Sequence, residues 1–389
     1  MSHEFATARL GESRHAGAAS DERPSRSCAE SMSTEATPDV KAGHAPAKTL
    51  VRALAVSDAG RWEEFVQHCP EATFFHRIGW KDILERCFGH RTHYLLAERS
   101  SRLVGVLPLA QVKSLLFGHA LISLPFCTSG GVAATDSCAI AALHDAACEL
   151  ANRLGAEHLE LRNRAPREPT WPRQDLYASF RKPIAPEVEA NMLAIPRKQR
   201  AMVRKGIKNG LSSRIDEGVD AFFALYADTM HRHGTPPLPR RYFEALQQTF
   251  GRDVEVLTIT DPDGKPVSGV LSFYFRDEVL PYYAGDIVAA RESAANDFKY
   301  WELMRRACER GIRVFDYGRS KRGTGPFDFK INWGFEPTPL AYEYHLIRRT
   351  HIPENNPLNP KYRALIALWR RLPVPVANFF GPYIAKSLG

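Results

Sequence analysis

The sequence predicts an α/β (α+β) protein made of two successive halves, each with a mixed, mostly antiparallel sheet flanked by helices. Two observations lead to this prediction. The chain has 389 residues, which is too long for one ordinary core and indicates two domains or two packed halves. In addition, the same order of elements (two helices, three strands, a helix and a strand) occurs twice along the chain.

The first half contains the first copy of this order. Apolar residues recur at helical spacing in three segments, and short apolar runs bounded by polar turns predict four strands. The expected elements are helices at 62–69 and 80–87, strands at 93–98, 103–109 and 120–124, a helix at 140–154 and a strand at 158–162. Gly89 and Gly155 follow two of these helices, and glycine commonly ends a helix.

The second half repeats the order. The expected elements are helices at 219–230 and 243–250, strands at 254–260, 267–275 and 279–284, a helix at 298–308 and a strand at 313–317. Gly105 in the first meander of strands matches Gly269 in the second. A meander followed by a helix and a parallel-compatible strand is the core of the GNAT (acyl-CoA N-acyltransferase) fold. The sequence therefore predicts two tandem GNAT-like halves, the alternative being an α/β protein that only looks repetitive.

We expect four parts along the chain. They are a disordered tail at 1–48, a first GNAT-like domain at 49–190, a second at 191–348 that carries the site, and a C-terminal arm at 349–389. The tail has almost no large apolar residue, so burial cannot offset the entropy lost on ordering it.

The C-terminal arm differs from the rest of the chain in its pattern of apolar and basic residues. Tyr362, Leu365 and Trp369 belong to an apolar helical stripe with basic residues around it, and we expect Pro373 and Pro375 to end that helix. The arm either packs on the domain or makes peripheral membrane contact through residues 357–389.

Composition limits the class of protein. The formal charge of +8 permits a polyanionic partner such as RNA, a lipid diphosphate or an anionic membrane face, and we expect no DNA partner. The seven cysteines are scattered without a CxxC pair, which argues against disulfides and a structural metal site. The first twenty residues lack the apolar core of a secretory signal. We therefore expect a cytoplasmic protein, with peripheral location at the inner membrane as an alternative.

The first candidate site is a basic segment that is expected to form a helix between Pro196 and Gly210. Six cations without an acid lie in it: Arg197, Lys198, Arg200, Arg204, Lys205 and Lys208. Met202, Val203 and Ile207 are expected to face inward. Such a helix can lie along a row of phosphates, and the alternative is an ordinary solvated helix face.

The second candidate is the stretch 315–335, which follows the last core strand. Asp316 lies at the strand end, and Arg319, Lys321 and Arg322 lie in a glycine-rich loop that can approach an anion closely. Lys330 lies in an apolar context that favours a partly desolvated ammonium, which can stabilise an oxyanion or hold a diphosphate. The alternative is a surface loop with one snorkelling lysine.

The third candidate is the strand end at Tyr282, Tyr283 and Asp286 with the loop that follows. GNAT enzymes hold the donor pyrophosphate at this junction with a glycine-rich pattern, which residues 291–296 lack. Backbone amides at a helix N-terminus can still bind phosphate, so either a donor site or a plain helix cap is expected here.

These features together resemble the FemAB-like family, which transfers an amino acid from aminoacyl-tRNA to an amine of a peptidoglycan precursor. More narrowly, the chain resembles FemAB-like proteins of exosortase/PEP-CTERM exopolysaccharide systems, which are also described as carrying a BioF2-like acetyltransferase domain. The resemblance covers about residues 50–345. Its most specific part is 315–335, supported by 235–239 and 282–286.

The resemblance implies roles for the candidate residues. The family's Phe-Lys pair matches Phe329 and Lys330, so Lys330 is expected to stabilise charge at the reacting carbonyl. We expect Asp316 or Tyr283 to accept or orient the proton of the amine. The expected substrate contacts are Tyr282, Asp286, Arg319, Lys321, Arg322, Phe329 and Trp333. The basic helix would contact tRNA or the diphosphate of the acceptor.

The donor is open at this point. The chain lacks the long coiled-coil arm with which some family members grip tRNA, so the activated donor is either aminoacyl-tRNA or acyl-CoA, and we expect no tightly bound cofactor. The expected function is transfer to an amine of a cell-envelope or exopolysaccharide precursor. The alternatives are an acyl-CoA-dependent N-acetyltransferase and a catalytically silent GNAT-like module that binds envelope precursors.

Overall fold

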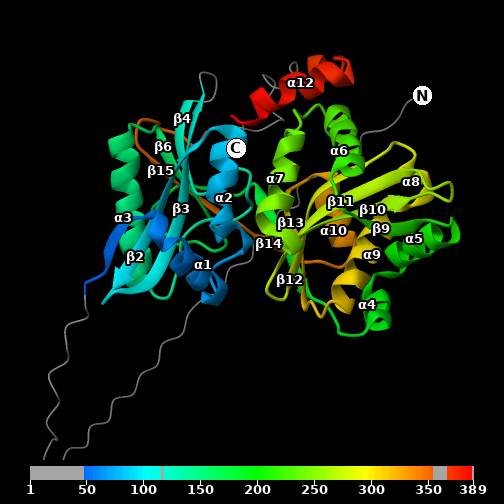
Figure 1. Cartoon of the computed structure of the whole chain (residues 1–389), viewed down its shortest axis with the longest axis horizontal. Coiled ribbons are helices and arrows are strands. Elements are labelled where there is room, and N and C mark those ends of the chain that lie inside the picture. The colour runs from blue at the N-terminus through cyan, green and yellow to red at the C-terminus, as the bar shows by residue number, and fades with distance from the viewer. Residues whose placement is uncertain (1–47, 115–117, 354–365, 388–389) are drawn as a thin grey trace, which may run out of the picture. The chain divides into compact units, whose positions relative to one another are not determined.

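The computed structural model describes residues 48–114, 118–353 and 366–387, which form two mixed sheets (Figure 1). The first sheet has the strand order β1-β2-β3-β4-β6-β15-β7, with β5 also paired to β3. The second has the order β14-β8-β13-β12-β11-β10-β9. The predicted tail lies outside the described residues except for Lys48.

The first sheet belongs mainly to the first half of the chain. Its early strands are β1 (Leu50–Ala53), β2 (Arg91–Arg99), β3 (Arg102–Ser114), β4 (Gly118–Ile122), β5 (Ala133–Ala134), β6 (His158–Asn163) and β7 (Arg173–Gln174). Its helices are α1 (Ala59–His68), α2 (Gly79–Ile83), which continues as a π-helical turn over Leu84–Phe88, and α3 (Ser137–Leu154). Asp136 accepts a hydrogen bond from the Ala139 amide and so begins α3, and Gly155 ends it with a φ of 68°.

The second sheet follows the same plan. Its strands include β9 (Ser212–Asp216), β10 (Val254–Thr260), β11 (Pro266–Phe275), β12 (Glu278–Asp286), β13 (Val314–Lys321) and β14 (Pro337–Pro339). Its helices are α4 (Val188–Ala194), α5 (Arg197–Lys208), α6 (Asp220–His233), α7 (Arg240–Phe250), α8 (Ala290–Ser293), α9 (Ala295–Glu309) and α10 (Gly325–Asn332). Every element of the predicted repeat is present in both halves.

Two strands cross between the halves, which the sequence did not predict. β8 (Tyr177–Pro183) lies within the range 49–190 but pairs with β13 and β14 in the second sheet. β15 (Ala341–Leu346) lies within the range 191–348 but pairs with β6 in the first sheet. A boundary near residue 190 therefore does not separate the sheets. Local periodicity predicts that a strand forms, whereas the edge that it joins depends on distant residues.

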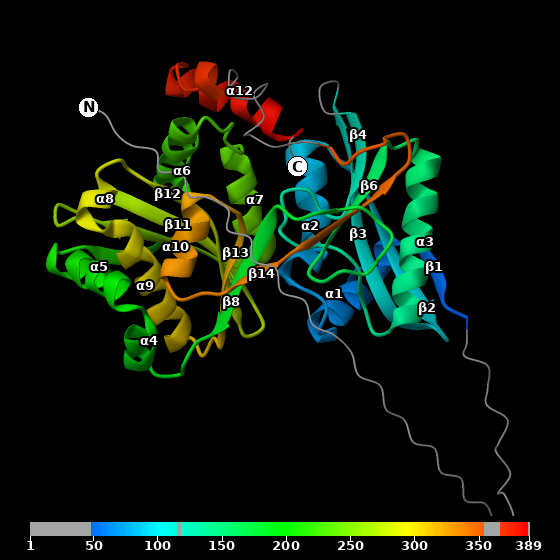
Figure 2. The same cartoon turned by 180° about the vertical axis from the view of Figure 1, so that it is seen from behind.

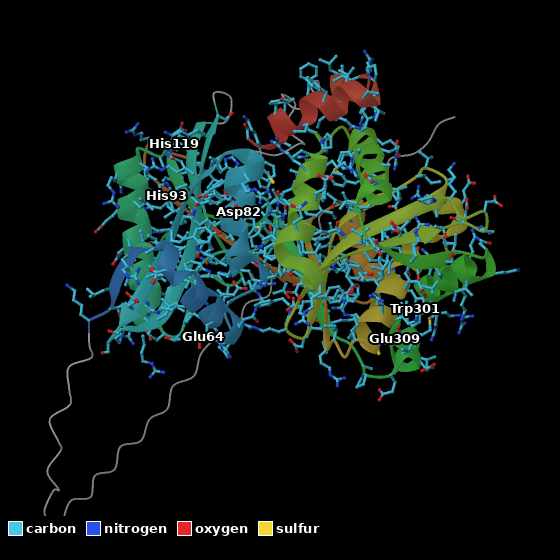
Figure 3. All side chains as sticks on the ribbon, viewed as in Figure 1. Glu64, Asp82, His93, His119, Trp301 and Glu309 are labelled. Atoms are coloured by element: carbon cyan, nitrogen blue, oxygen red, sulfur yellow. The ribbon has the colours of Figure 1, made fainter. Side chains whose placement is uncertain are left out.

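The two halves also share one aromatic core. Phe74 stacks on Phe273 of β11 with ring centroids 4.4 Å apart, and Phe75 contacts Tyr282 of β12 at 5.1 Å. Gly79 begins α2 against α7, where an added Cβ would lie 2.5 Å from Thr249 Cγ2, so only glycine permits this approach. Figure 3 shows side chains filling the space between α2 and α7. The halves are therefore held as one unit.

The C-terminal arm confirms one prediction and adds a helix to it. The helical residues 366–369 end before Pro373, as predicted. A second helix that was not predicted, α12 (Val374–Ala385), begins directly after Pro373, because proline fits the first helical turn, where its missing amide is not needed. Tyr362 and Leu365 lie outside the described residues. The arm packs against α6, where His231 Nε2 lies 2.8 Å from the carbonyl oxygen of Leu372. Both views place α12 beside α6 (Figures 1 and 2).

Candidate active site

A bulge in β13 positions the candidate site. Asp316 pairs with Arg181 of β8, but the next pair joins Arg319 to Ser179. Between these two pairs β13 advances by three residues while β8 advances by two, so β13 contains one extra residue. Gly318, inside the bulge, has a φ of 63°, which glycine adopts without strain. A bulge redirects side chains and leaves backbone groups without ladder partners. Asp316 is therefore the last residue of β13 that pairs with β8 in regular register before the bulge begins.

Lys330 satisfies the carbonyl groups of this bulge. α10 places the side chain beneath β13, where it is 8% exposed. Its Nζ donates to the carbonyl oxygens of Tyr317 at 2.5 Å, Gly318 at 3.2 Å and Arg319 at 3.2 Å. Burial lowers the pKa of Lys330 to about 7, and the negative charge of Asp316 opposes this shift. Three acceptors match the three protons of an ammonium, so the charged form fits this position.

Asp316 is a carboxyl group with an unusual pKa. Its Oδ1 accepts a hydrogen bond from the Gly318 amide at 2.7 Å. Burial and then the negative charge of Glu278 raise the pKa of Asp316 from 3.8 to about 7. Arg181 donates to Glu278 Oε2 at 2.9 Å and so holds that second carboxylate in place. A carboxyl with a pKa near neutrality can both accept and return a proton at physiological pH.

Asp316 lines a pocket to which both halves contribute. The polar lining residues are Thr73, Thr128, Ser129, Arg164, Ser179, Arg181, Arg276, Asp277, Glu278 and Asp316. Thr73, Thr128 and Ser129 come from the first half, while Arg276 and Glu278 come from the turn and strand of the second. The pocket of about 80 Å³ is smaller than the roughly 300–1,000 Å³ typical of ligand sites. It therefore suits the reacting groups of a substrate rather than a whole substrate.

The two predicted tyrosines lie in the shared core instead of this pocket. Tyr282 donates to the carbonyl oxygen of Phe126 at 2.8 Å, and the hydroxyl groups of Tyr283 and Tyr242 lie 2.9 Å apart. Burial raises the pKa of Tyr283 well above its usual value. A hydroxyl with so high a pKa is rarely ionised near neutral pH, so Tyr283 is a weaker candidate for a general base than Asp316.

Asp286 lies at the opposite end of β12 from Glu278. Its Oδ1 accepts from Lys299, a fully buried side chain, at 2.9 Å, and it also accepts from the hydroxyl group of Ser268. Eight residue steps along a strand span about 26 Å. The structure therefore does not bring Asp286 together with Asp316.

Arg319 makes contacts across the halves. It donates to the hydroxyl group of Tyr342 in β15 at 2.9 Å, and its guanidinium lies 4.6 Å from the ring centroid of Tyr177. Tyr342 in turn donates to the carbonyl oxygen of Thr128 at 2.6 Å. Arg319 thus links β13 to the exchanged strand and to the loop that lines the pocket.

The other residues that were predicted to contact substrate lie either at the surface or in the core. Arg322 is exposed and lies 3.3 Å from Asp175, and Lys321 precedes it at the end of β13. Phe329 packs against Trp333 in the aromatic cluster beside α9. Trp333 is fully buried and donates to Asp297 at 3.0 Å, so it has no surface from which to contact a substrate.

The predicted basic helix is α5, and it packs on α9 through Val203 and Gly206. Ile207 was expected to face inward but is 51% exposed, because Gly206 occupies the contact with Phe298, where an added Cβ would lie 2.8 Å from Phe298 Cβ. Among the described residues, none of the six cations of α5 lies within 4.0 Å of a carboxylate oxygen. The helix therefore presents uncompensated positive charge, with Arg200 partly covered and the other five cations exposed.

Sequence reasoning missed Glu278 and Arg181. The run Arg276, Asp277 and Glu278 between two strands is typical of an exposed turn, so it carried no signal of a site. Arg181 reaches Glu278 only because β8 crosses into the second sheet. Arg181 therefore lies near Asp316 because β8 crosses between the halves, whereas Glu278 lies there because β12 pairs with β13.

Comparison with known proteins agrees with this fold. Residues 197–330 match the family described as Acetyltransferase (GNAT) domain. A UDP-N-acetylmuramoylpentapeptide-lysine N(6)-alanyltransferase of Weissella viridescens is 23% identical over 105 residues, which cover 26% of this chain and 31% of that protein. The chain thus matches about a third of the length of that curated relative.

Solved structures resemble a larger part of the chain. The crystal structure of FemX superimposes with a TM-score of 0.61 and 15% identity, covering 81% of this chain and 100% of that one. The C-terminal domain of a putative lysylphosphatidylglycerol synthetase from Agrobacterium fabrum has a TM-score of 0.52 and 13% identity, covering 80% and 94%. The predicted α/β architecture with two mixed sheets is confirmed as the tandem GNAT fold seen in FemX. The narrower resemblance to exosortase-associated proteins stays a prediction.

The Asp316→Asn variant tests the carboxyl environment through stability alone. Between the ordinary pKa of 3.8 and the folded value of about 7, the folded state binds more protons than the unfolded state, so this group makes wild-type stability fall as pH rises. Asparagine removes the effect and keeps an acceptor for the Gly318 amide. We compare the melting temperatures of the variant and the wild type at each pH. We expect the variant to gain on the wild type between pH 4 and pH 8, by about 2–4 °C for each kcal/mol of unfolding free energy that the wild type loses. Calorimetry with Asp328→Asn, an exposed site on α10, is the control, and a pH-independent difference contradicts the shift.

Proposed function

We propose that this chain is an N-acyltransferase or aminoacyltransferase that moves an activated acyl or aminoacyl group to an amine of a cell-envelope or exopolysaccharide precursor. The observation that carries the proposal is the carboxyl of Asp316, with a pKa of about 7, in a pocket lined by both halves. The match to a GNAT acetyltransferase domain ends at Lys330, in the helix that supports this carboxyl. The curated relative transfers an alanyl group to the N(6) amine of a lysine, by its name.

The chemistry needs no covalent enzyme intermediate, since the donor ester or thioester is already activated. The nitrogen of the amine attacks the donor carbonyl, a C–N bond forms, and the C–O or C–S bond to the leaving group breaks. The proton lost by the amine passes to the Asp316 carboxylate, whose pKa suits transfer in both directions. The guanidinium group of Arg181 faces the same pocket and supplies a donor for the charge that develops on the carbonyl oxygen, while the Ser179 hydroxyl lies 3.5 Å from Asp316 Oδ1 and donates to it.

Lys330 acts in this proposal as a positioning residue. Its Nζ is bound to three carbonyl groups of β13, so its positive charge supports the bulge that holds Asp316. This differs from the role that the family resemblance implies, in which the ammonium contacts the reacting carbonyl directly.

For the donor, α5 favours aminoacyl-tRNA. Its exposed and uncompensated cations match a row of phosphates better than a single diphosphate. Acyl-CoA is the second candidate, because α9 begins at Ala295 without a side-chain cap, and the N-terminus of a helix can bind phosphate.

Removal of the Asp316 carboxylate should abolish most of the activity. We expect Asp316→Asn to lower kcat/KM by about 100-fold or more, the usual contribution of a general base. In wild type, kcat/KM should rise with pH through an apparent pKa near 7, since only the carboxylate accepts a proton. Glu278→Gln removes the neighbouring negative charge and should move the rising limb of the pH–rate profile to lower pH.

Transfer of labelled acyl groups to a UDP-linked muramoyl pentapeptide measures the rate and its pH dependence, with Asp328→Asn as control. An unchanged rate in Asp316→Asn would show that Asp316 is not the general base.

The Lys330→Ala variant separates the two roles of the lysine. As a positioning residue, Lys330 supplies positive charge near Asp316, so its loss should reduce kcat/KM more than about threefold and move the limb to higher pH. A slower rate with an unmoved pH profile supports direct contact with the reacting carbonyl instead. A rate within threefold of wild type contradicts both roles. Lys113→Ala, in an exposed part of β3, is the control.

Neutralising α5 tests the donor. We expect glutamine at Arg197, Lys198, Arg204 and Lys205 to raise KM for an aminoacyl-tRNA donor about tenfold and to flatten its dependence on salt. Glutamine at four exposed arginines elsewhere removes the same net charge and should have little effect: Arg91, Arg102, Arg153 and Arg252. Mass spectrometry of co-purified ligands identifies the donor independently. An unaffected KM together with bound coenzyme A favours the acyl-CoA alternative.

A further inference from the structure

α12 packs on the body of the protein with its small residues. Ala377, Gly381 and Ala385 are buried, and their spacing of four residues places them on one face of the helix. An added Cβ at Gly381 would lie 2.4 Å from Pro237 Cδ, in the segment between α6 and α7. This close approach leaves no room for larger side chains on the inner face.

The large apolar side chains of α12 point the other way. Phe379 is 64% exposed, Phe380 is 53% exposed and Tyr383 is 63% exposed, and Leu368 just before the helix is 60% exposed. The Phe379 and Phe380 rings contact each other at 5.0 Å. Figure 3 shows side chains of α12 projecting from its outer side. A helix of a soluble domain normally buries such residues, so an outward aromatic face indicates a partner.

The C-terminal segment that forms this face carries charge of a single sign. α12 itself contains no charged residue, while Arg370 and Arg371 precede it and Lys386 follows it, all three exposed. After Glu354 the sequence contains no acid at all, and five cations: Lys361, Arg363, Arg370, Arg371 and Lys386. Across the groove that Phe379 and Tyr383 line, Arg86 and Arg241 add two cations, and the one acid, Glu85, is ion-paired with Lys81. The border of this aromatic face is therefore predominantly cationic and complements a surface that is apolar in its interior and anionic at its rim.

We propose that α12 docks on the surface of a membrane that contains anionic lipids. Phe379, Phe380 and Tyr383 would enter the boundary between headgroups and acyl chains, and the flanking cations would contact lipid phosphates. The 12 residues of α12 extend about 18 Å, short of the roughly 30 Å hydrocarbon core. No helix of the described residues is long and apolar enough to cross a membrane. α12 therefore lies along the surface.

A second copy of the chain fits this face less well. A symmetric contact through α12 would bring Arg370, Arg371 and Lys386 of one copy close to the same cations of the other. No acid of the C-terminal segment is present to compensate them. Lipid headgroups supply the missing negative charge.

Co-sedimentation of the full chain with vesicles tests the docking. We expect binding to vesicles of equal phosphatidylglycerol and phosphatidylcholine, weaker binding to phosphatidylcholine alone, and loss of binding with added salt. Replacing Phe379, Phe380 and Tyr383 by serine should weaken partitioning about tenfold or more. Replacing Arg370, Arg371 and Lys386 by glutamine should remove the preference for anionic lipid.

The matched control places serine at Val56 and Leu193, two exposed apolar residues on other faces, and should bind like wild type. Circular dichroism verifies that each variant is folded. Absence of binding to either vesicle, or equal binding by the aromatic variant, overturns the proposal. Light scattering measures the oligomeric state. If the wild type is a dimer and the aromatic variant is a monomer, the face contacts a second copy of the chain, and the membrane proposal is wrong. None of these readouts depends on transferase activity.

Discussion

The contact between Phe74 and Phe273 lies at the centre of a core that both halves share, and the arrangement of the site depends on it. Aromatic side chains bury a large apolar area, so this cluster fixes how the first half meets β11 and β12 of the second. The exchanged strands β8 and β15 add backbone pairing in both directions. Because the halves are joined in these two ways, a pocket lined by residues from both can keep a defined geometry.

In the pocket between the halves, residues on and around the irregular strand β13 determine the charge environment of Asp316. Asp316 lies directly before the bulge of β13 and close to Glu278, so burial and the negative charge of Glu278 both disfavour its ionised form. Arg181 neutralises Glu278, and Lys330 holds the bulge from beneath. Burial and like charge raise one pKa to the range in which proton transfer to and from an amine is effective. The residues that support the bulge therefore also set the charge environment of Asp316.

The uncompensated surfaces of the molecule are of different kinds. α5 presents cations without acids and suits a polyanion, whereas α12 presents aromatic rings bordered by cations and suits a lipid surface. Both helices pack inward through small residues, Gly206 in one and Gly381 in the other, so that the larger side chains remain outside. In each case close backbone packing on the body frees the outer face for a partner.

The sequence by itself determined the repeated order of elements and the choice of Asp316, Lys330 and α5 as candidates, because periodicity, glycine and charge runs are local properties. Only the tertiary structure decided that β8 and β15 exchange sheets, that Glu278 lies beside Asp316, and that Lys330 binds backbone carbonyl groups. These facts depend on pairs of residues far apart in the chain, such as Asp316 and Arg181. Local pattern does not encode which edge a strand joins, or which charges burial brings together.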